Sequence, residues 1–318
     1  MTERPVAWRS EGDLRNAAMA ARLYYLEHRS KLEIAEELGV NRFKVARLLE
    51  RAHASGLVHI EIRDPDGVDE DMSEKLAAAL GIRRAIVLGI ATDPMGQVGA
   101  LAARYLAEVM QPEMTVGIAW SRSTQALVEH LEPAPPCTVV QLCGVIAQAE
   151  GEEQNVELVR RAAKSLGGRP MTFYAPLVVS EPAVATALKR QPGIAEALRA
   201  CDHLDVAVIA VGQWEPGEST VHDALSPVER AGFAKRGAVA ESAGMLFSAT
   251  GKSLRDGLQR RVIAVNERQL RKARDVVALA SDQGRARAVQ ALARTGLVTT
   301  LITHRALASE ILDPKDRD

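Results

Sequence analysis

The hydrophobic positions of the first sixty residues recur at helical spacing, and residues that begin or end helices divide them. This spacing predicts a first helix over Leu14–His28. A second helix begins at Ser30, because Ser30 and Glu33 match a capping box. Gly39 ends it, since the following turn needs left-handed backbone angles. The positions that these helices and the next one turn inward are Met19, Leu23, Leu26, Ile34, Ala35, Leu38, Val45, Leu48, Leu49 and Ala52.

A third helix follows and carries the positive charge of this region. Asn41 is a favourable N-cap, and Gly56 marks the end of the helix. Between Asn41 and Arg51 there are four basic residues and one acid. Residues Leu57–Ile62 alternate between apolar and polar, as a short strand does. Two helices joined by a tight turn, the second basic on its outer face, indicate a helix-turn-helix, and the strand suggests a winged variant.

The rest of the chain, residues 64–318, alternates between apolar runs and amphipathic helical stretches. Several runs are continuously apolar, as in strands buried on both faces of a parallel sheet. The pattern predicts a doubly wound, mostly parallel α/β domain. Its predicted strands are Arg84–Leu88, Thr115–Ala119, Thr138–Leu142, Asp205–Val211, Val262–Val265, Asp275–Ala280 and Val298–Thr303. Its predicted helices include Gly96–Met110, Gln154–Leu166, Arg285–Arg294 and Arg305–Leu312.

The break between the two patterns predicts two domains. The run Asp64-Pro-Asp-Gly67 is typical of a linker. We therefore expect a DNA-binding domain over residues 1–63, with residues 1–13 as a loose arm. Residues 64–318 would form a domain for effector binding and oligomerisation.

Charge and composition agree with a protein that reads DNA sequence and does not coat nucleic acid. The 318 residues carry a net charge of −1, whereas residues 1–63 hold 11 Lys or Arg and 9 Asp or Glu. A local basic face on a nearly neutral chain fits a sequence reader. The three cysteines show no metal or redox spacing, and no apolar run is long enough to span a membrane. We expect a cytoplasmic protein without a metal, a cofactor or a membrane partner.

The third predicted helix supplies the candidate DNA contacts. Lys44, Arg47 and Arg51 fall on one outward face, and Arg42 and Phe43 occupy the first turn. The alternative is a helical hairpin whose basic face is merely solvated. The residues that we predict to contact double-stranded operator DNA are Asn41, Arg42, Phe43, Lys44, Arg47 and Arg51.

Three predicted strands end in polar residues that could bind a ligand. In parallel sheets, ligands bind beyond the carboxyl ends of strands and at helix N-termini. Gly117–Thr124, Val211–Trp214 and Ala280–Arg285 each follow a strand in this way. The alternative for each is a set of ordinary helix caps.

Motifs of catalysis are missing from the sequence. There is no His-x-x-x-His spacing, no P-loop and no Gly-x-Gly-x-x-Gly fingerprint. Glu241 and Asp282 are the only carboxylates that we consider as candidate general bases, and neither lies in a catalytic motif. We therefore expect no catalytic residues and no enzyme activity.

The chain resembles the SorC group of bacterial sugar-binding transcriptional regulators over nearly its whole length. The resemblance rests on Ile34-Ala-Glu-Glu-Leu-Gly-Val40, Val116-Gly-Ile-Ala-Trp120, Gln141-Leu-Cys-Gly144 and Gly237-Ala-Val-Ala-Glu241, among other segments. It implies a helix-turn-helix joined to an effector domain that is similar in fold to phosphosugar isomerases but has lost catalysis. It also implies a homodimer or homotetramer that binds sugars, sugar phosphates or polyols. Together with the strand ends, it gives the predicted effector-binding residues Ser121, Ser123, Thr124, Gln141, Gln213, Glu241, Asp282 and Arg285.

The departures from the family pattern bear on the effector. Where the family has Gly-Gly-x-x-Lys, this chain has Ser281-Asp-Gln-Gly-Arg285. Asp282 thus replaces a glycine that would let backbone amides approach a phosphate, and its charge partly cancels that of Arg285. We expect an unphosphorylated sugar or polyol in preference to a phosphorylated one.

The sequence therefore predicts an effector-responsive transcriptional regulator of carbohydrate or polyol catabolism, a repressor that its effector releases. A phosphosugar isomerase-like enzyme is the main alternative, since a fold does not fix a function. A scaffold that binds only protein is a third.

Overall fold

The computed structural model describes residues 11–58, 67–89, 91–145, 155–255 and 257–313. The chain divides into two compact units, residues 1–62 and 63–318, and each is described here by itself. The predicted domain boundary and linker lie largely in residues 59–66, outside the described part. Of the predicted loose arm, residues 1–10 are also outside it, whereas residues 11–13 belong to the first helix.

The first unit contains the two capped helices that the sequence predicts. Helix α1 (Glu11–Ala21) continues into a π-helical turn, η1 (Arg22–Leu26), and is followed by α2 (Lys31–Glu37) and α3 (Arg42–Ala54). The capping box of Ser30 and Glu33 is present. The side chain of Asn41 caps α3 by accepting a hydrogen bond from the amide of Lys44 at 2.8 Å.

The core of this unit is built almost wholly from the predicted apolar positions of α2 and α3, but α1 is rotated relative to the prediction. Leu23 is buried as predicted, whereas Met19 and Leu26 are exposed and Ala17 and Ala20 are buried in their place. Small alanine side chains allow α1 to approach α3 closely, which explains the choice. Most of the predicted strand Leu57–Ile62 lies outside the described residues, and its first two residues are not in a strand.

The second unit is built on a parallel sheet of seven strands in the order β1-β10-β9-β5-β2-β3-β4. Every pairing in it is parallel, so the predicted fold class is confirmed. The strands are β1 (Arg84–Leu88), β2 (Thr115–Ile118), β3 (Thr138–Gln141), β4 (Arg169–Met171), β5 (Val206–Ala210), β9 (Asp275–Leu279) and β10 (Thr300–His304).

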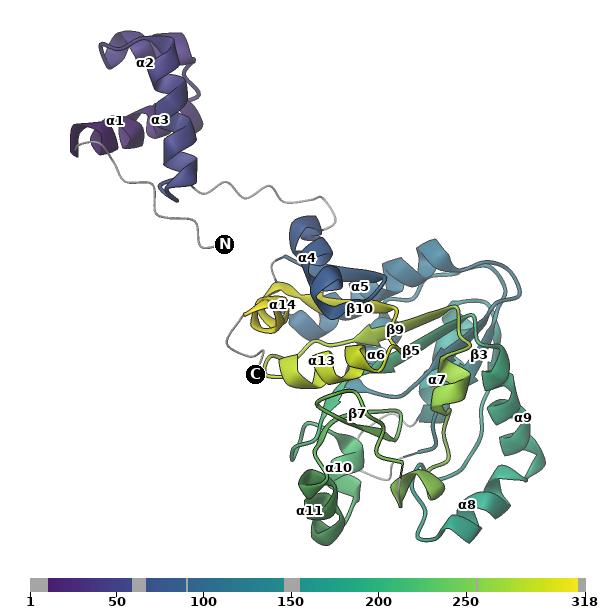
Figure 1. Ribbon diagram of the computed structural model, residues 1–318. Helices are drawn as coiled ribbons and strands as arrows, with labels where there is room; N and C mark the ends of the chain where they lie inside the picture. Colours follow the sequence, from purple (N-terminus) through teal and green to yellow (C-terminus); the bar gives the residue numbers. More distant parts are fainter. Residues whose placement is uncertain (1–10, 59–66, 90, 146–154, 256, 314–318) are drawn as a thin grey trace. The chain divides into compact units, whose positions relative to one another are not determined.

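Alternate residues of each central strand pack against different helical layers. Val206 and Val208 of β5 face the core formed with α5, α6 and α7, whereas Ala207 and Ile209 face the core formed with α4, α13 and α14. The two layers are visible on opposite sides of the sheet (Figure 1). The helices of the two layers are α5 (Pro94–Val109), α6 (Arg122–Glu129), α7 (Asn155–Ser165), α4 (Glu70–Leu80), α13 (Ala286–Arg294) and α14 (Arg305–Leu312).

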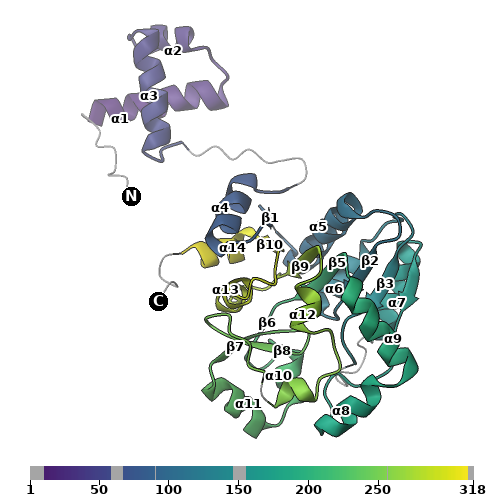
Figure 2. The ribbon, with the colours of Figure 1, turned by 45° about the vertical axis from the view of Figure 1, so that its right-hand side comes forward.

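A small antiparallel sheet follows β5 and was not predicted. It pairs β6 (Gly212–Gln213) with β7 (Ala238–Ser242), and β7 with β8 (Met245–Ser248), as Figure 2 shows. The prediction of a strand at Val262–Val265 is wrong. Val262 and Ala264 make only isolated bridges, to Val178 and Cys143, because their partners are loops and not strands.

Short helices complete the second unit on the side of the small sheet and the loops. They are α8 (Pro182–Lys189), α9 (Pro192–Ala200), α10 (Thr220–Ala224), α11 (Pro227–Lys235) and α12 (Glu267–Leu270), with the 3-10 turns η2 (Cys201–His203) and η3 (Leu258–Arg260).

Helices α5 and α6 touch so closely at Gly99 that no side chain fits there. A Cβ atom at this position would lie 2.5 Å from the carbonyl carbon of Ala126 in α6. We expect Gly99→Ala to lower the free energy of unfolding by about 1–3 kcal/mol, because backbone must move to admit the methyl group.

Urea denaturation followed by circular dichroism measures this effect. Gly232→Ala is the matched control, because Gly232 lies inside exposed helix α11 with nothing within 4 Å of its Cβ position. There, alanine should raise stability by about 0.5–1 kcal/mol. Equal effects of the two substitutions would contradict the close approach of α5 and α6.

Candidate functional site

The three polar strand ends singled out in the sequence meet at one cavity. The chain leaves β2 in one direction across the sheet and β5 in the other, so the switch point of the topology lies between these neighbouring strands. Residues that follow β2, β5 and β9 line a cavity of about 240 Å³ beyond the carboxyl ends of the strands. This is where ligands bind in open parallel sheets.

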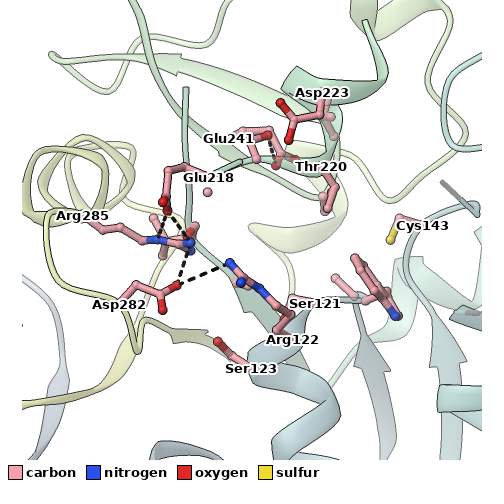
Figure 3. Close-up of a pocket in the computed structure, with 18 of the residues that line it drawn as sticks. Ser121, Arg122, Ser123, Cys143, Glu218, Thr220, Asp223, Glu241, Asp282 and Arg285 are labelled. Atoms are coloured by element: carbon pink, nitrogen blue, oxygen red, sulfur yellow. Dashed lines mark hydrogen bonds and ion pairs between the residues drawn. The ribbon is translucent and has the colours of Figure 1, made fainter. Parts of the chain in front are cut away.

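Arg285 is the buried cation of this cavity, with only 8% of its surface exposed. Its Nη1 donates a hydrogen bond to the carbonyl oxygen of Val211 at 2.8 Å. Its Nη2 lies 2.7 Å from Oε2 of Glu218 and 2.6 Å from Oδ2 of Asp282 (Figure 3). Its Nε donates to Glu218 at 3.2 Å. The guanidinium is thus surrounded by acceptors of the protein itself.

Glu241 is a second buried ionisable residue of the cavity lining. Strand β7 places it opposite Gly212 of β6. Its Oε1 accepts from the amide of Gly244 at 2.7 Å, and its Oε2 accepts from the hydroxyl of Ser219 at 3.1 Å. Burial raises the pKa of Glu241 above the ordinary value of 4.5, against the lowering effects of these two hydrogen bonds and of Arg285.

The hydroxyl groups after β2 are partly used within the protein. Ser121 and Thr124 form a capping box at the start of α6, and the Thr124 hydroxyl also donates to the carbonyl of Ala119 at 2.8 Å. The Ser123 hydroxyl lies 3.0 Å from that of Ser281. Ser121 and Ser123 line the cavity, whereas Thr124 is fully buried behind them.

The structure brings together five of the eight residues predicted to bind an effector. Ser121, Ser123, Glu241, Asp282 and Arg285 line the cavity. The other three do not. Thr124 caps α6. The side chain of Gln141 donates a hydrogen bond to the carbonyl of Cys143 and accepts one from the amide of Phe173. Gln213 lies in β6, just after the lining residue Gly212.

Sequence reasoning missed several polar residues of the cavity. Glu218, Ser219, Thr220 and Asp223 come from the loop after β6 and from α10, and Arg122 begins α6. Asp223 accepts from the amide of Gly217 at 3.0 Å and lies 2.9 Å from Nδ1 of His222. A Gly217 turn followed by a Ser219 cap was the one signal that could have located this loop.

In the first unit, the outer face of α3 presents most of the predicted DNA contacts to solvent. Arg42, Phe43 and Arg47 are exposed. Lys44 is half-buried, and its Nζ lies 3.9 Å from Oδ1 of Asp13. Asn41 uses its side-chain oxygen as the helix cap, and Arg51 is half-buried near the end of the helix.

The described residues contain neither a cluster of metal ligands nor a membrane-spanning helix. Nowhere in them do three or more His, Cys, Asp or Glu side chains gather as metal ligands would. Among the same residues, every helix is too short or too polar to cross a bilayer. Cys137, Cys143 and Cys201 are buried and form no disulfide.

The raised pKa of Glu241 predicts a pH dependence of stability. The folded protein holds this proton at pH values where the unfolded chain has released it, so stability falls as the pH rises from about 4.5 through the folded pKa. Glu241→Gln has no such titration. The free energy of unfolding of the wild type relative to E241Q should therefore fall over this range.

Urea denaturation at a series of pH values makes the measurement. Glu229→Gln is a control with the opposite sign, because hydrogen bonds from Ser226 and the charge of Arg261 lower the pKa of Glu229. Its contribution to stability is present above pH 4.5 and is lost as the pH falls. A wild-type stability that rises with pH relative to E241Q would contradict the assignment.

The sequence of this chain is similar to a known domain family and to known regulators. Over residues 68–313 the chain matches the family described as "Putative sugar-binding domain". It is 26% identical over 301 residues to the transcriptional regulator LsrR of Enterobacter sp. (strain 638), covering 93% of this chain and 92% of that protein. It is also 26% identical over 302 residues to LsrR of Klebsiella pneumoniae, covering 93% and 92%.

Solved structures share the fold. The full-length sorbitol operon regulator SorC from Klebsiella pneumoniae superimposes with a TM-score of 0.73 at 20% identity, covering 95% of this chain and 100% of that chain. A transcriptional regulator from Streptococcus pneumoniae gives 0.72 at 19% identity, covering 78% and 98%. The relatives are named as regulators and not as enzymes, which supports the predicted function and not the isomerase alternative. The chain therefore belongs to this sugar-binding domain family, and its predicted place among the SorC-type transcriptional regulators is confirmed.

Proposed function

We propose that this protein is a cytoplasmic repressor that binds operator DNA through α3 and is released by a small, unphosphorylated sugar or polyol bound in the cavity beside Arg285. The domain of residues 1–63 would read the operator. The domain of residues 64–318 would bind the effector and form a homodimer or homotetramer.

The charge balance of the cavity carries the choice of effector. The described residues that line it include three partly exposed carboxylates, Glu218, Asp223 and Asp282, and two guanidiniums, Arg122 and Arg285. Glu241 adds less negative charge than these three, because burial raises its pKa. A phosphate brings about two further negative charges. Arg285 already meets two of the carboxylates at salt-bridge distance, so it has little to offer a phosphate. The balance favours an uncharged ligand.

Hydroxyl groups suit the same walls. Ionised carboxylates are pure hydrogen-bond acceptors, and each can accept from more than one hydroxyl. Glu218, Asp223 and Asp282 are partly exposed, so a ligand can reach their oxygens. Oδ2 of Asp282 also lies 4.0 Å from Nη2 of Arg122. Ser121, Ser123 and Thr220 add groups that donate as well as accept. A polyol would thus be bound through several hydrogen bonds of modest strength.

Operator release would follow from a shift in population between two arrangements of an oligomer. An effector that binds one arrangement more tightly favours it, and the spacing between the two reading helices then no longer matches the operator. A coupling free energy of about 1–3 kcal/mol gives a useful response.

The first test concerns the ligand. We expect isothermal titration calorimetry to detect binding from a panel of free sugars and polyols, with sorbitol as the first probe because the related Klebsiella regulator is named for the sorbitol operon. The phosphate ester of the same compound should bind at least about tenfold more weakly, a difference of 1.4 kcal/mol. Asp282→Asn removes one negative charge and should therefore reduce the difference in affinity between the free compound and its phosphate ester.

Asp202→Asn is the control for charge alone, because Asp202 pairs with Arg268 and Lys272 and is not among the lining residues. It should leave this difference in affinity unchanged. Tight binding of the phosphate ester, with no heat from any free polyol, would refute the unphosphorylated effector.

The second test concerns the operator. Arg47→Ala should weaken binding to a promoter fragment from the gene's own neighbourhood by about tenfold, because one lost DNA contact typically costs about 1–3 kcal/mol. Fluorescence anisotropy at several salt concentrations measures the affinity and its salt slope. Lys75→Ala, which removes a surface charge of the second unit paired with Asp71, is the control and should bind like the wild type. Unchanged affinity of R47A would contradict the DNA-reading face.

A further inference from the structure

We propose that Phe43 recognises thymine in the operator, by packing its ring on the C5 methyl group in the major groove. The proposal rests on the proposed function, since it needs α3 to enter the groove. It adds the identity of one base and the residue that selects it.

The position of Phe43 gives it no role in the protein core. It lies in the first turn of α3, and 66% of its surface is exposed. The apolar residues that follow it, Val45, Leu48 and Leu49, are buried in the core of the first unit. A large exposed aromatic ring is costly in water, and it pairs best with an apolar partner.

The neighbours of Phe43 define the kind of surface that would cover it. The guanidinium carbon of Arg42 lies 4.9 Å from the ring centroid, and Arg47 is exposed one helical turn further on. Arg42, Lys44 and Arg47 therefore place positive charge around an apolar ring at the start of α3. The complementary surface must carry negative charge around a small apolar group.

The major groove of DNA has this composition. Its walls are phosphates, and among the groups on its base edges the C5 methyl of thymine is the apolar one, which phenylalanine contacts in known complexes. The N-terminal residues of a recognition helix are those that reach base edges. Phe43 occupies such a position, and the guanidinium of Arg42 lies over its ring.

A single methyl group can be removed from DNA to test this. The full-length protein first selects its preferred sequence from a random duplex pool. Each thymine of that sequence is then replaced in turn by deoxyuridine, which keeps base pairing and loses only the methyl group. If the selected sequence contains repeats, one thymine in each repeat should be the sensitive position. Its replacement by deoxyuridine should lower the DNA affinity of the wild-type protein about fourfold, the factor expected for one buried methyl group.

Phe43→Ala completes the cycle. It should bind the thymine and uracil duplexes equally, while Phe43→Leu should keep part of the preference. Leu32→Ala is the matched control, since Leu32 is a similarly exposed apolar residue that belongs to α2 and not to α3, and it should retain the full wild-type preference. Circular dichroism verifies that the variants remain folded.

The outcomes separate the two levels of the account. Selection of a sequence without thymine, or equal losses on uracil replacement in the wild type and F43A, would overturn the role of Phe43 and leave the regulator intact. Failure of the wild type to enrich any sequence would contradict the proposed function itself.

Discussion

A guanidinium cannot be buried without compensation, and the cavity at the switch point of the sheet is organised by that requirement. Charged groups that leave water must find partners of good geometry, or they cost several kcal/mol. Arg285 follows β9, while its acceptors come from the end of β5, from the loop after β6 and from its own turn. Three separated parts of the chain are therefore held together around one charge, at the switch point of the sheet.

The same requirement supports the proposal that the ligand is unphosphorylated. Asp282 occupies the position where the family pattern has a glycine, and it lies 2.6 Å from Nη2 of Arg285. Glu218 takes the other approach to that guanidinium. Carboxylates of the protein thus occupy the positions around Arg285 that an anionic ligand would otherwise take. The cavity is therefore rich in hydrogen-bond acceptors.

Much of the fold could be predicted from the sequence because its signals are local. Caps such as Ser30 and Asn41 act within a few residues, and continuous apolar runs such as Asp205–Val211 indicate buried strands. Strand β4 was missed because it is a short, largely exposed edge strand that contains Pro170. The strands β6, β7 and β8 gave no separable signal, since their pairing depends on a turn at Gly244 and on contacts far apart in the chain.

The site was partly predictable for the same reason. Residues directly after strands, such as Ser121 and Asp282, are placed by topology, which an alternating pattern reveals. Glu218 and Asp223 reach the cavity from a loop and a five-residue helix, whose path no periodicity encodes. Polar type alone did not separate a structural role from a binding one, as the buried Gln141 shows.

The central claim is that ligand in the cavity and operator on α3 are energetically coupled, and thermodynamic linkage tests it most directly. The operator affinity is measured with and without saturating free polyol, and the polyol affinity with and without saturating operator. Coupling predicts that saturating polyol lowers the operator affinity and that saturating operator lowers the polyol affinity by the same factor. If neither affinity changes when the other ligand is present, the two sites are not coupled and the central claim is wrong.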